Sequence, residues 1–165
     1  MTTLQTVSEQ PSQTTKPLLK TIAWVGLLAG SLDILSAFVQ AYLAKAISPV
    51  IVLQYVASGA VGKVAFAGGW QMALLGLLFH FIIAYSFTAL FFIIYPSIKL
   101  FSKNIVLTAI LYGIFIYIAM DQVVLRFTRV PPLTFHLDKA LIATAILIVA
   151  IGLPCAYFAR KFYRN

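Results

Sequence analysis

The chain has 165 residues, of which 62% are hydrophobic and only 10% are charged, and its mean hydropathy is +0.98. Soluble domains are about half apolar and about a quarter charged, so this composition excludes a soluble globular domain and leaves little sequence for an extramembrane catalytic domain. Twelve Lys and Arg residues outnumber four Asp and Glu residues. Because no basic helix with interleaved aromatic side chains appears outside the apolar runs, this excess predicts contact with lipid headgroups and not with nucleic acid.

The beginning of the chain is polar and rich in Thr, Ser and Gln, which predicts a disordered tail over residues 1–20. An apolar run then extends from Ile22 to about Leu43, which is about the 20 residues that a helix needs to cross a bilayer. Basic residues before the run and the small-residue pattern Val39-Gln40-Ala41 raise the alternative of a cleaved signal peptide. Asp33 inside the run, and the length of the run, favour a retained membrane helix.

Residues 44–69 are apolar but contain one proline and four glycines, so they are too interrupted for a regular membrane span. Ser48 suits the N-cap position and Pro49 suits the first helical position, which predicts a short helix as far as about Ser58. A short apolar helix of this kind is typical of an interfacial or re-entrant element. The glycines do not form a phosphate-binding loop, because their spacing is wrong and no Ser or Thr follows Lys63.

Three further apolar runs are long enough to cross a membrane, at about residues 70–95, 104–125 and 139–158. Pro154 inside the last run predicts a kink. With the run at about 22–43, they make one transmembrane domain over residues 21–160, followed by a basic tail at 161–165. We therefore predict an all-α polytopic membrane protein, a bundle of four transmembrane helices with a short interfacial or re-entrant helix between the first and the second.

Basic residues are unevenly divided between the two sides of the membrane that four spans define. The side of the termini carries seven: Lys16, Lys20, Lys99, Lys103, Arg160, Lys161 and Arg164. The other side carries five: Lys45, Lys63, Arg126, Arg129 and Lys139. The positive-inside rule therefore predicts a multi-pass protein of the plasma membrane with both termini in the cytoplasm.

The second span contains one ionisable residue, His80, near its middle. The residues one helical turn apart on the side of His80 are small: Ala73, Gly76, Ala84 and Thr88. Another side is bulky and suits lipid: Leu74, Leu77, Leu78, Phe81 and Phe92. Because small residues allow helix backbones to approach closely within a membrane, His80 is expected to face another helix.

Asp33 is the ionisable residue of the first span and shares its face with Gly26 and Gly30. At about 1.5 Å per residue, it lies roughly 18 Å from the cytoplasmic start of its helix, and His80 lies roughly 15 Å from the outer start of an antiparallel helix. These depths agree within a hydrocarbon core about 30 Å thick. We therefore predict that the first two spans pack together with Asp33 and His80 in direct contact.

Two functions fit a paired Asp33 and His80. Ionisable residues inside a membrane are functional candidates, so one hypothesis is a non-enzymatic protein that binds or relays a proton or a small polar ligand at this centre. The alternative is a structural or assembly subunit of a membrane complex, in which the pair only holds helices together. A Ser-His-Asp or paired-carboxylate arrangement for catalysis is not visible. The expected partners are the lipid bilayer and, as an open alternative, further copies of the chain or other subunits of a membrane complex.

No cofactor or metal is expected. Two histidines and the single Cys155 do not make a typical zinc or haem site, and one cysteine excludes an intrachain disulfide. A site made by Asp33, His80 and Asp121 is the remaining metal alternative. Asp121 lies near the outer end of the third span, below Arg126, and these two residues predict either a rim salt bridge or a polar outer vestibule above Asp33.

Four short motifs in the first half of the chain are distinctive: Gly30-Ser31-Leu32-Asp33, Gln54-Tyr55-Val56-Ala57-Ser58-Gly59, Ala65-Phe66-Ala67-Gly68-Gly69 and Leu75-Gly76-Leu77-Leu78-Phe79-His80-Phe81. These motifs resemble a group of small uncharacterised bacterial four-span integral membrane proteins. The resemblance covers roughly residues 26–95. It weakens afterwards, apart from Tyr112-Gly113 and the stretch from Asp121 to Leu125, where similar proteins are expected to carry Asn in place of Asp121. It implies placement in the bacterial inner membrane and no particular activity or substrate.

Overall fold

The computed structural model of the protein describes residues 15–120 and 136–164. Within these two ranges the chain is helical almost throughout and has no strand. The α-helices are α1 (Thr15–Lys45), α2 (Pro49–Val61), α3 (Gly69–Ile94), α4 (Ile105–Ala119), α5 (Leu137–Leu147) and α6 (Leu153–Arg164). Two 3-10 helices, η1 (Gly62–Ala67) and η2 (Tyr95–Ser97), extend α2 and α3, and a π-helical segment, η5 (Ile148–Gly152), joins α5 to α6 without a break.

Four helical stretches are long and apolar enough to cross a membrane: Pro17–Lys45, Pro49–Ala67, Gly69–Ser97 and Leu137–Arg164. The predicted all-α bundle of a multi-pass membrane protein is therefore confirmed. Residues 49–67 were expected to be too interrupted for a membrane span. They nevertheless form one of the four stretches, because η1 continues α2 as a helix. Of the third expected span, α4 accounts for Ile105–Ala119, and residues 121–125 lie outside the described residues.

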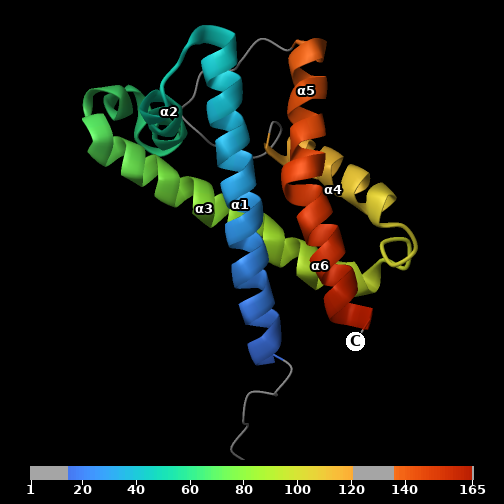
Figure 1. Cartoon of the computed structure of the whole chain (residues 1–165). Helices are drawn as coiled ribbons and strands as arrows, with labels where there is room; N and C mark the ends of the chain where they lie inside the picture. Colours follow the sequence, from blue (N-terminus) through green and yellow to red (C-terminus); the bar gives the residue numbers. More distant parts are fainter. Residues whose placement is uncertain (1–14, 121–135, 165) are drawn as a thin grey trace, which may run out of the picture.

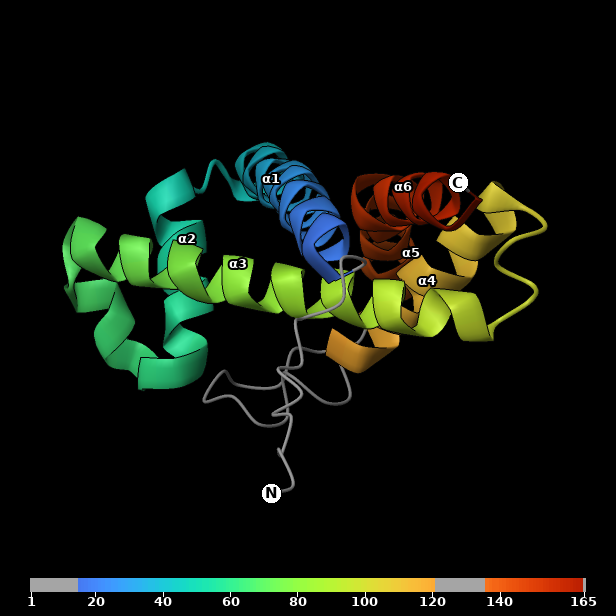
Figure 2. The same ribbon diagram turned by 90° about the horizontal axis from the view of Figure 1, so that it is seen from below.

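The long helices have a simple arrangement. Helix α1 and the continuous rod of α5, η5 and α6 lie side by side and run in opposite directions (Figure 1). The start of α1 and the end of α6 therefore lie at the same end of the molecule, while α3 crosses α1 obliquely (Figures 1 and 2). This placement fits an even number of membrane crossings between the start of α1 and the end of α6.

Helix α2 folds against the first half of α3 (Figure 1). It begins at Pro49, as expected, but runs to Val61 and continues as η1. Gly62 follows α2 with a positive φ of 75°, a conformation that glycine adopts without steric cost. The Gln54 side-chain amide donates a 2.7 Å hydrogen bond to the Gly69 carbonyl, which ties α2 to the start of α3.

The small side of α3 is a surface for helix packing. Its predicted members are all buried: Ala73, Gly76, Ala84 and Thr88. A β-carbon at Gly76 would overlap the carbonyl group of Leu53 on α2, so the two backbones are in contact there. Further along α3, Ala84 lies against Gly30 of α1. The same stripe of small residues thus packs against two different helices.

Helix α1 crosses α3 over two glycines. The ring of Tyr85 covers Gly26, while Phe81 and Ala84 lie against Gly30. A β-carbon at Gly30 would lie 2.9 Å from the Phe81 ring and 3.1 Å from the Ala84 β-carbon, so only glycine fits without a shift. The structure therefore contains the predicted packing of the first span on the next long apolar helix through small residues.

The expectation that Phe92 faces lipid is wrong. Phe92 is 0% exposed, whereas Leu74 and Leu78 on the same helix are 50% and 56% exposed. Helix α3 has different neighbours along its length, with α2 and α1 against its first part and α4 and α6 against its end. No single side of a helix can face lipid throughout when its neighbours change in this way.

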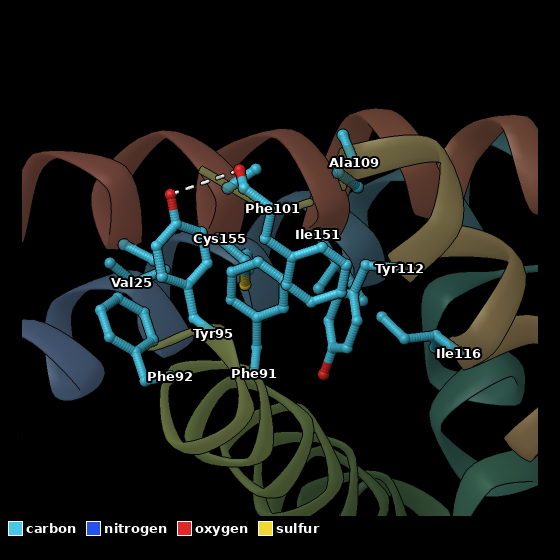
Figure 3. Close-up of a cluster of buried hydrophobic side chains, with 14 residues drawn as sticks. Val25, Phe91, Phe92, Tyr95, Phe101, Ala109, Tyr112, Ile116, Ile151 and Cys155 are labelled. Atoms are coloured by element: carbon cyan, nitrogen blue, oxygen red, sulfur yellow. Dashed lines mark hydrogen bonds between the residues drawn. The ribbon is translucent and has the colours of Figure 1, made fainter. Parts of the chain in front are cut away.

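Phe92 belongs to an aromatic core at the end of α3 (Figure 3). Phe91 lies at the centre of this core, with ring-centroid distances of 4.4 Å to Tyr112, 5.6 Å to Tyr95 and 5.7 Å to Phe101. The Tyr95 hydroxyl donates a 3.4 Å hydrogen bond to the Phe101 carbonyl. These contacts join α3, α4 and the connection between them into one packed unit.

Helix α4 lies against the π-helical segment through a pair of glycines. A β-carbon at Gly152 would lie 2.5 Å from the Ala109 carbonyl oxygen, and one at Gly113 would lie 2.9 Å from the Ile148 α-carbon. Pro154 is the second residue of α6 and cannot donate the backbone hydrogen bond of a regular α-helix. The π-helical segment is the irregularity in the rod at this point, where the sequence predicted a kink.

Candidate intramembrane polar centre

Asp33 and His80 lie where α1 crosses α3. The Nε2 atom of His80 lies 2.8 Å from the carbonyl oxygen of Gly30 on α1. Because a carbonyl oxygen only accepts hydrogen bonds, His80 Nε2 is the donor and carries a proton. This hydrogen bond joins the two helices and fixes the orientation of the imidazole ring.

The local sequence of α1 makes this contact possible. Gly30 has no side chain to hold α3 away, and Phe81 and Ala84 fill the space beside it. The carbonyl oxygen has two lone pairs, so Gly30 can accept the helical hydrogen bond of α1 and the imidazole bond together. The residue that the sequence marked as a packing glycine is thus also the hydrogen-bond partner of His80.

Asp33 is half-buried and lies one helical turn beyond Gly30 on α1. Its carboxylate interacts electrostatically with His80. The described part of the chain contains no ion pair or direct hydrogen bond between them, because His80 Nε2 is engaged by the Gly30 carbonyl. The structure therefore brings the two predicted residues together, but by way of the α1 backbone and not in the direct contact that the sequence suggested.

The centre has hydrogen-bonding capacity that the described residues do not use. Within residues 15–120 and 136–164, the Asp33 carboxylate has no hydrogen-bond donor and His80 Nδ1 has no partner. An ionised carboxylate accepts several hydrogen bonds, and a free Nδ1 can accept a proton or a hydrogen bond. Asp33 and His80 are only half-buried, so these two atoms are open to a proton or a polar ligand.

The surroundings of the pair are mostly apolar or already satisfied. The Phe81 ring meets the His80 ring edge-on at 5.3 Å. The hydroxyl of Ser36 on α1 donates to Leu32 and that of Ser86 on α3 donates to Ile82, each within its own helix. These hydroxyls are therefore satisfied without contributing to the Asp33–His80 centre.

Three surface grooves of about 350 to 440 Å³ lie elsewhere on the described structure. One lies between α1 and the α5–η5 part of the rod, one between α1 and α6, and one between α4 and α6. Neither Asp33 nor His80 lines any of these three. The grooves and the polar centre are therefore separate features of the molecule.

The other predicted site residues have different outcomes. Asp121 and Arg126, the proposed outer vestibule, lie outside the described residues. Cys155 is buried with 0% exposure. Among the described His, Cys, Asp and Glu residues, no group of three is placed to hold a metal ion.

Sequence reasoning missed two features. The Gly30 carbonyl was not recognised as a partner for His80, although its small-residue face was the signal that a backbone lies close there. The sequence predicts only a basic tail at residues 161–165, whereas the folded chain forms a groove between α4 and α6 that Arg160 and Arg164 line.

No protein-family model, curated protein or solved structure matches the chain.

Proposed function

We propose that this chain is a non-enzymatic integral membrane protein whose Asp33–His80 centre binds or relays a proton or a small polar ligand. The observation that carries the proposal is the unused hydrogen-bonding capacity of the Asp33 carboxylate and of His80 Nδ1. Ionisable residues inside a membrane segment are functional candidates, and the interhelical bond of His80 Nε2 uses neither the carboxylate nor Nδ1.

The hydrogen bond to Gly30 defines how a proton would be bound. Nε2 already donates to the carbonyl, so proton uptake takes place at Nδ1 and leaves the interhelical bond intact. The imidazolium that forms then faces the negative charge of Asp33. Proton binding and release can thus occur without separating α1 from α3.

The second candidate is a structural or assembly subunit, and the hydrogen bond from His80 to Gly30 is what favours it. Interhelical hydrogen bonds and close packing of small residues are sufficient to hold membrane helices together. In this alternative, Asp33 and His80 contribute to stability and have no ligand. Further copies of the chain or other membrane subunits would then be its partners.

We further propose a bacterial inner membrane location with both termini in the cytoplasm. Six basic residues lie in the first turns of α1, in the last turns of α6, or in the connection between α3 and α4, which packs on the end of α6 through Tyr95 and Tyr163: Lys20, Lys99, Lys103, Arg160, Lys161 and Arg164. Lys45 and Lys139 lie at the ends of α1 and α5 that face the other way. This distribution supports the orientation through the positive-inside rule, and the motif resemblance supports the bacterial membrane.

A double-mutant cycle at two pH values tests the proposed function. The variants are Asp33→Asn, His80→Gln and the two combined, all in a His136→Gln background that removes the other histidine. The glutamine amide can still donate to Gly30, so His80→Gln removes the titration while it keeps a donor. Unfolding free energies in detergent should show a coupling of about 0.5–3 kcal/mol at pH 5. The coupling should differ between pH 5 and pH 8, because the charge of a proton-binding centre changes with pH.

Two serines provide matched controls for this cycle. Ser36→Ala on α1 and Ser86→Ala on α3 remove hydroxyls that bond only to their own helices, so neither should couple to the variants at the polar centre. An equal coupling at both pH values would favour the assembly subunit. Strictly additive effects at both pH values would reject any functional link between Asp33 and His80.

A further inference from the structure

A basic groove of about 350 Å³ lies between the last two turns of α6 and the start of α4. Five residues line it: Ile105, Tyr157, Arg160, Lys161 and Arg164. Three of the five are cationic, and all three are on the part of α6 that faces the start of α4. The groove is separate from the Asp33–His80 centre, which it does not contact.

Arg160 is the residue that distinguishes this groove from an ordinary charged surface. Its Nε atom is buried and has no hydrogen-bond partner. Almost all buried polar groups in proteins are paired, so an unpaired guanidinium nitrogen indicates a missing acceptor. A planar guanidinium is suited to the oxygen atoms of a carboxylate or phosphate, to which it donates two parallel hydrogen bonds.

The described chain supplies no anion to meet this charge. Asp33 lies in the middle of α1, and Asp138 lies in the first turn of α5, at the other end of the rod. Lys99 and Lys103, in the connection before α4, add positive charge at the same end. No carboxylate of the described residues therefore faces the cationic side chains of the groove.

We propose that this groove binds a phosphate group and that the phosphate belongs to an anionic phospholipid. Ile105 and Tyr157 give the groove an apolar wall, and Tyr157 is 53% exposed. Tyrosines are enriched at membrane–water interfaces, and the groove lies at the end of a helix long enough to cross a membrane. Basic pockets between helices on the cytoplasmic side are suited to anionic headgroups, and inorganic phosphate lacks the acyl chains that would contact the apolar wall.

The test measures binding of phosphatidylglycerol and phosphatidylcholine to the detergent-purified full chain by native mass spectrometry. Arg164→Gln and Lys161→Gln change exposed residues of the groove, and Arg160→Gln removes the buried donor. Each should weaken phosphatidylglycerol binding by about fivefold or more, as expected for removing a basic residue near an anionic headgroup. Lys20→Gln removes one charge at the same end but outside the groove, and should change binding by less than about twofold because salt screens distant charges.

Each outcome bears on the proposal. Equal losses for Lys20→Gln and the groove variants would mean general surface attraction and would overturn it, as would equal binding of phosphatidylcholine. Displacement of phosphatidylglycerol by inorganic phosphate at equal concentration would assign the groove to a free anion and overturn the lipid source. If Arg160→Gln does not fold, the exposed Lys161→Gln and Arg164→Gln still decide the matter. Asp33→Asn should leave lipid binding unchanged, so this proposal stands or falls independently of the polar centre.

Discussion

At the scale of single residues, Gly30 is the position on which the polar centre depends. Its carbonyl accepts the hydrogen bond from His80 Nε2 at 2.8 Å, and its missing side chain allows α3 to approach. The position therefore combines two requirements that are usually met by different residues. Any side chain at residue 30 alters the packing of α1 on α3 and the geometry of the imidazole bond together.

Gly30→Ala should lower the unfolding free energy by about 1 kcal/mol. A new β-carbon would lie 2.9 Å from the Phe81 ring and 3.1 Å from Ala84, and overpacking of this kind costs about 1–3 kcal/mol. Alanine recovers up to about 1 kcal/mol through its higher helix propensity, so the net loss is modest. Chemical denaturation in detergent measures the change, with Ser36→Ala on the same helix as the control. An unchanged or increased stability would show that α1 and α3 do not pack this closely.

At the scale of the elements, the contact between α2 and α3 is tighter than that between α1 and α3. The obstacle at Gly76 is the carbonyl group of Leu53, which belongs to the backbone and cannot rotate away as an aromatic ring can. Gly76 is also held close to α2 by the hydrogen bond between Gln54 and Gly69 near the start of α3. The two helices can relieve a clash there only by moving apart.

Gly76→Ala should therefore be more damaging than Gly30→Ala. We expect a loss toward the upper end of the roughly 1–3 kcal/mol range for overpacked sites, or failure to fold. Leu78→Ala, on the 56% exposed side of the same helix, is the control and should change stability much less. The comparison uses the same denaturation assay for all three variants. A smaller loss for Gly76→Ala than for Gly30→Ala would contradict the described packing of α2 on α3.

The elements also show what the sequence could and could not predict. Apolar length identified the long helices, and the stripe of small residues on α3 identified a packing surface, because both signals depend on local composition. Phe92 was misassigned because membrane cores and lipid are equally apolar, so hydrophobicity does not tell which of them a side chain faces. The glycines of residues 59–69 suggested a break, but η1 keeps this segment helical.

The polar centre could be predicted only in part, because the sequence gives the depth of a residue along a helix but not the direction in which it faces. Similar depth along two antiparallel spans was enough to place Asp33 near His80. Depth says nothing about rotation of a helix about its axis, and that rotation brings the imidazole to the Gly30 carbonyl rather than to the carboxylate. The basic groove depends on how α4 meets α6, which no local pattern in either helix encodes.

At the scale of the whole molecule, the arrangement of the helices makes a definite prediction about topology. Cys155 is the single cysteine and is 0% exposed, so the native chain gives a low background for thiol labelling. Ser102 lies at the same end of the molecule as the C-terminal end of α6. Ser102→Cys should therefore be labelled only after the cells are permeabilised, which gives the reagent access to the cytoplasm. Ser48→Cys, after the far end of α1, should react with an impermeant reagent in intact cells. Labelling of Ser102→Cys in intact cells would contradict cytoplasmic termini.

The claim that His80 is a proton-binding residue held by Gly30 is tested most directly by nitrogen NMR of the ¹⁵N-histidine-labelled protein in bilayers. The His136→Gln background leaves one histidine to observe. The neutral ring should carry its proton on Nε2, which donates to the Gly30 carbonyl, and a second proton should bind at Nδ1 when the pH is lowered. Asp33→Asn should change the pH at which that second proton binds. A neutral ring protonated on Nδ1, or a titration unaffected by Asp33→Asn, would contradict the account.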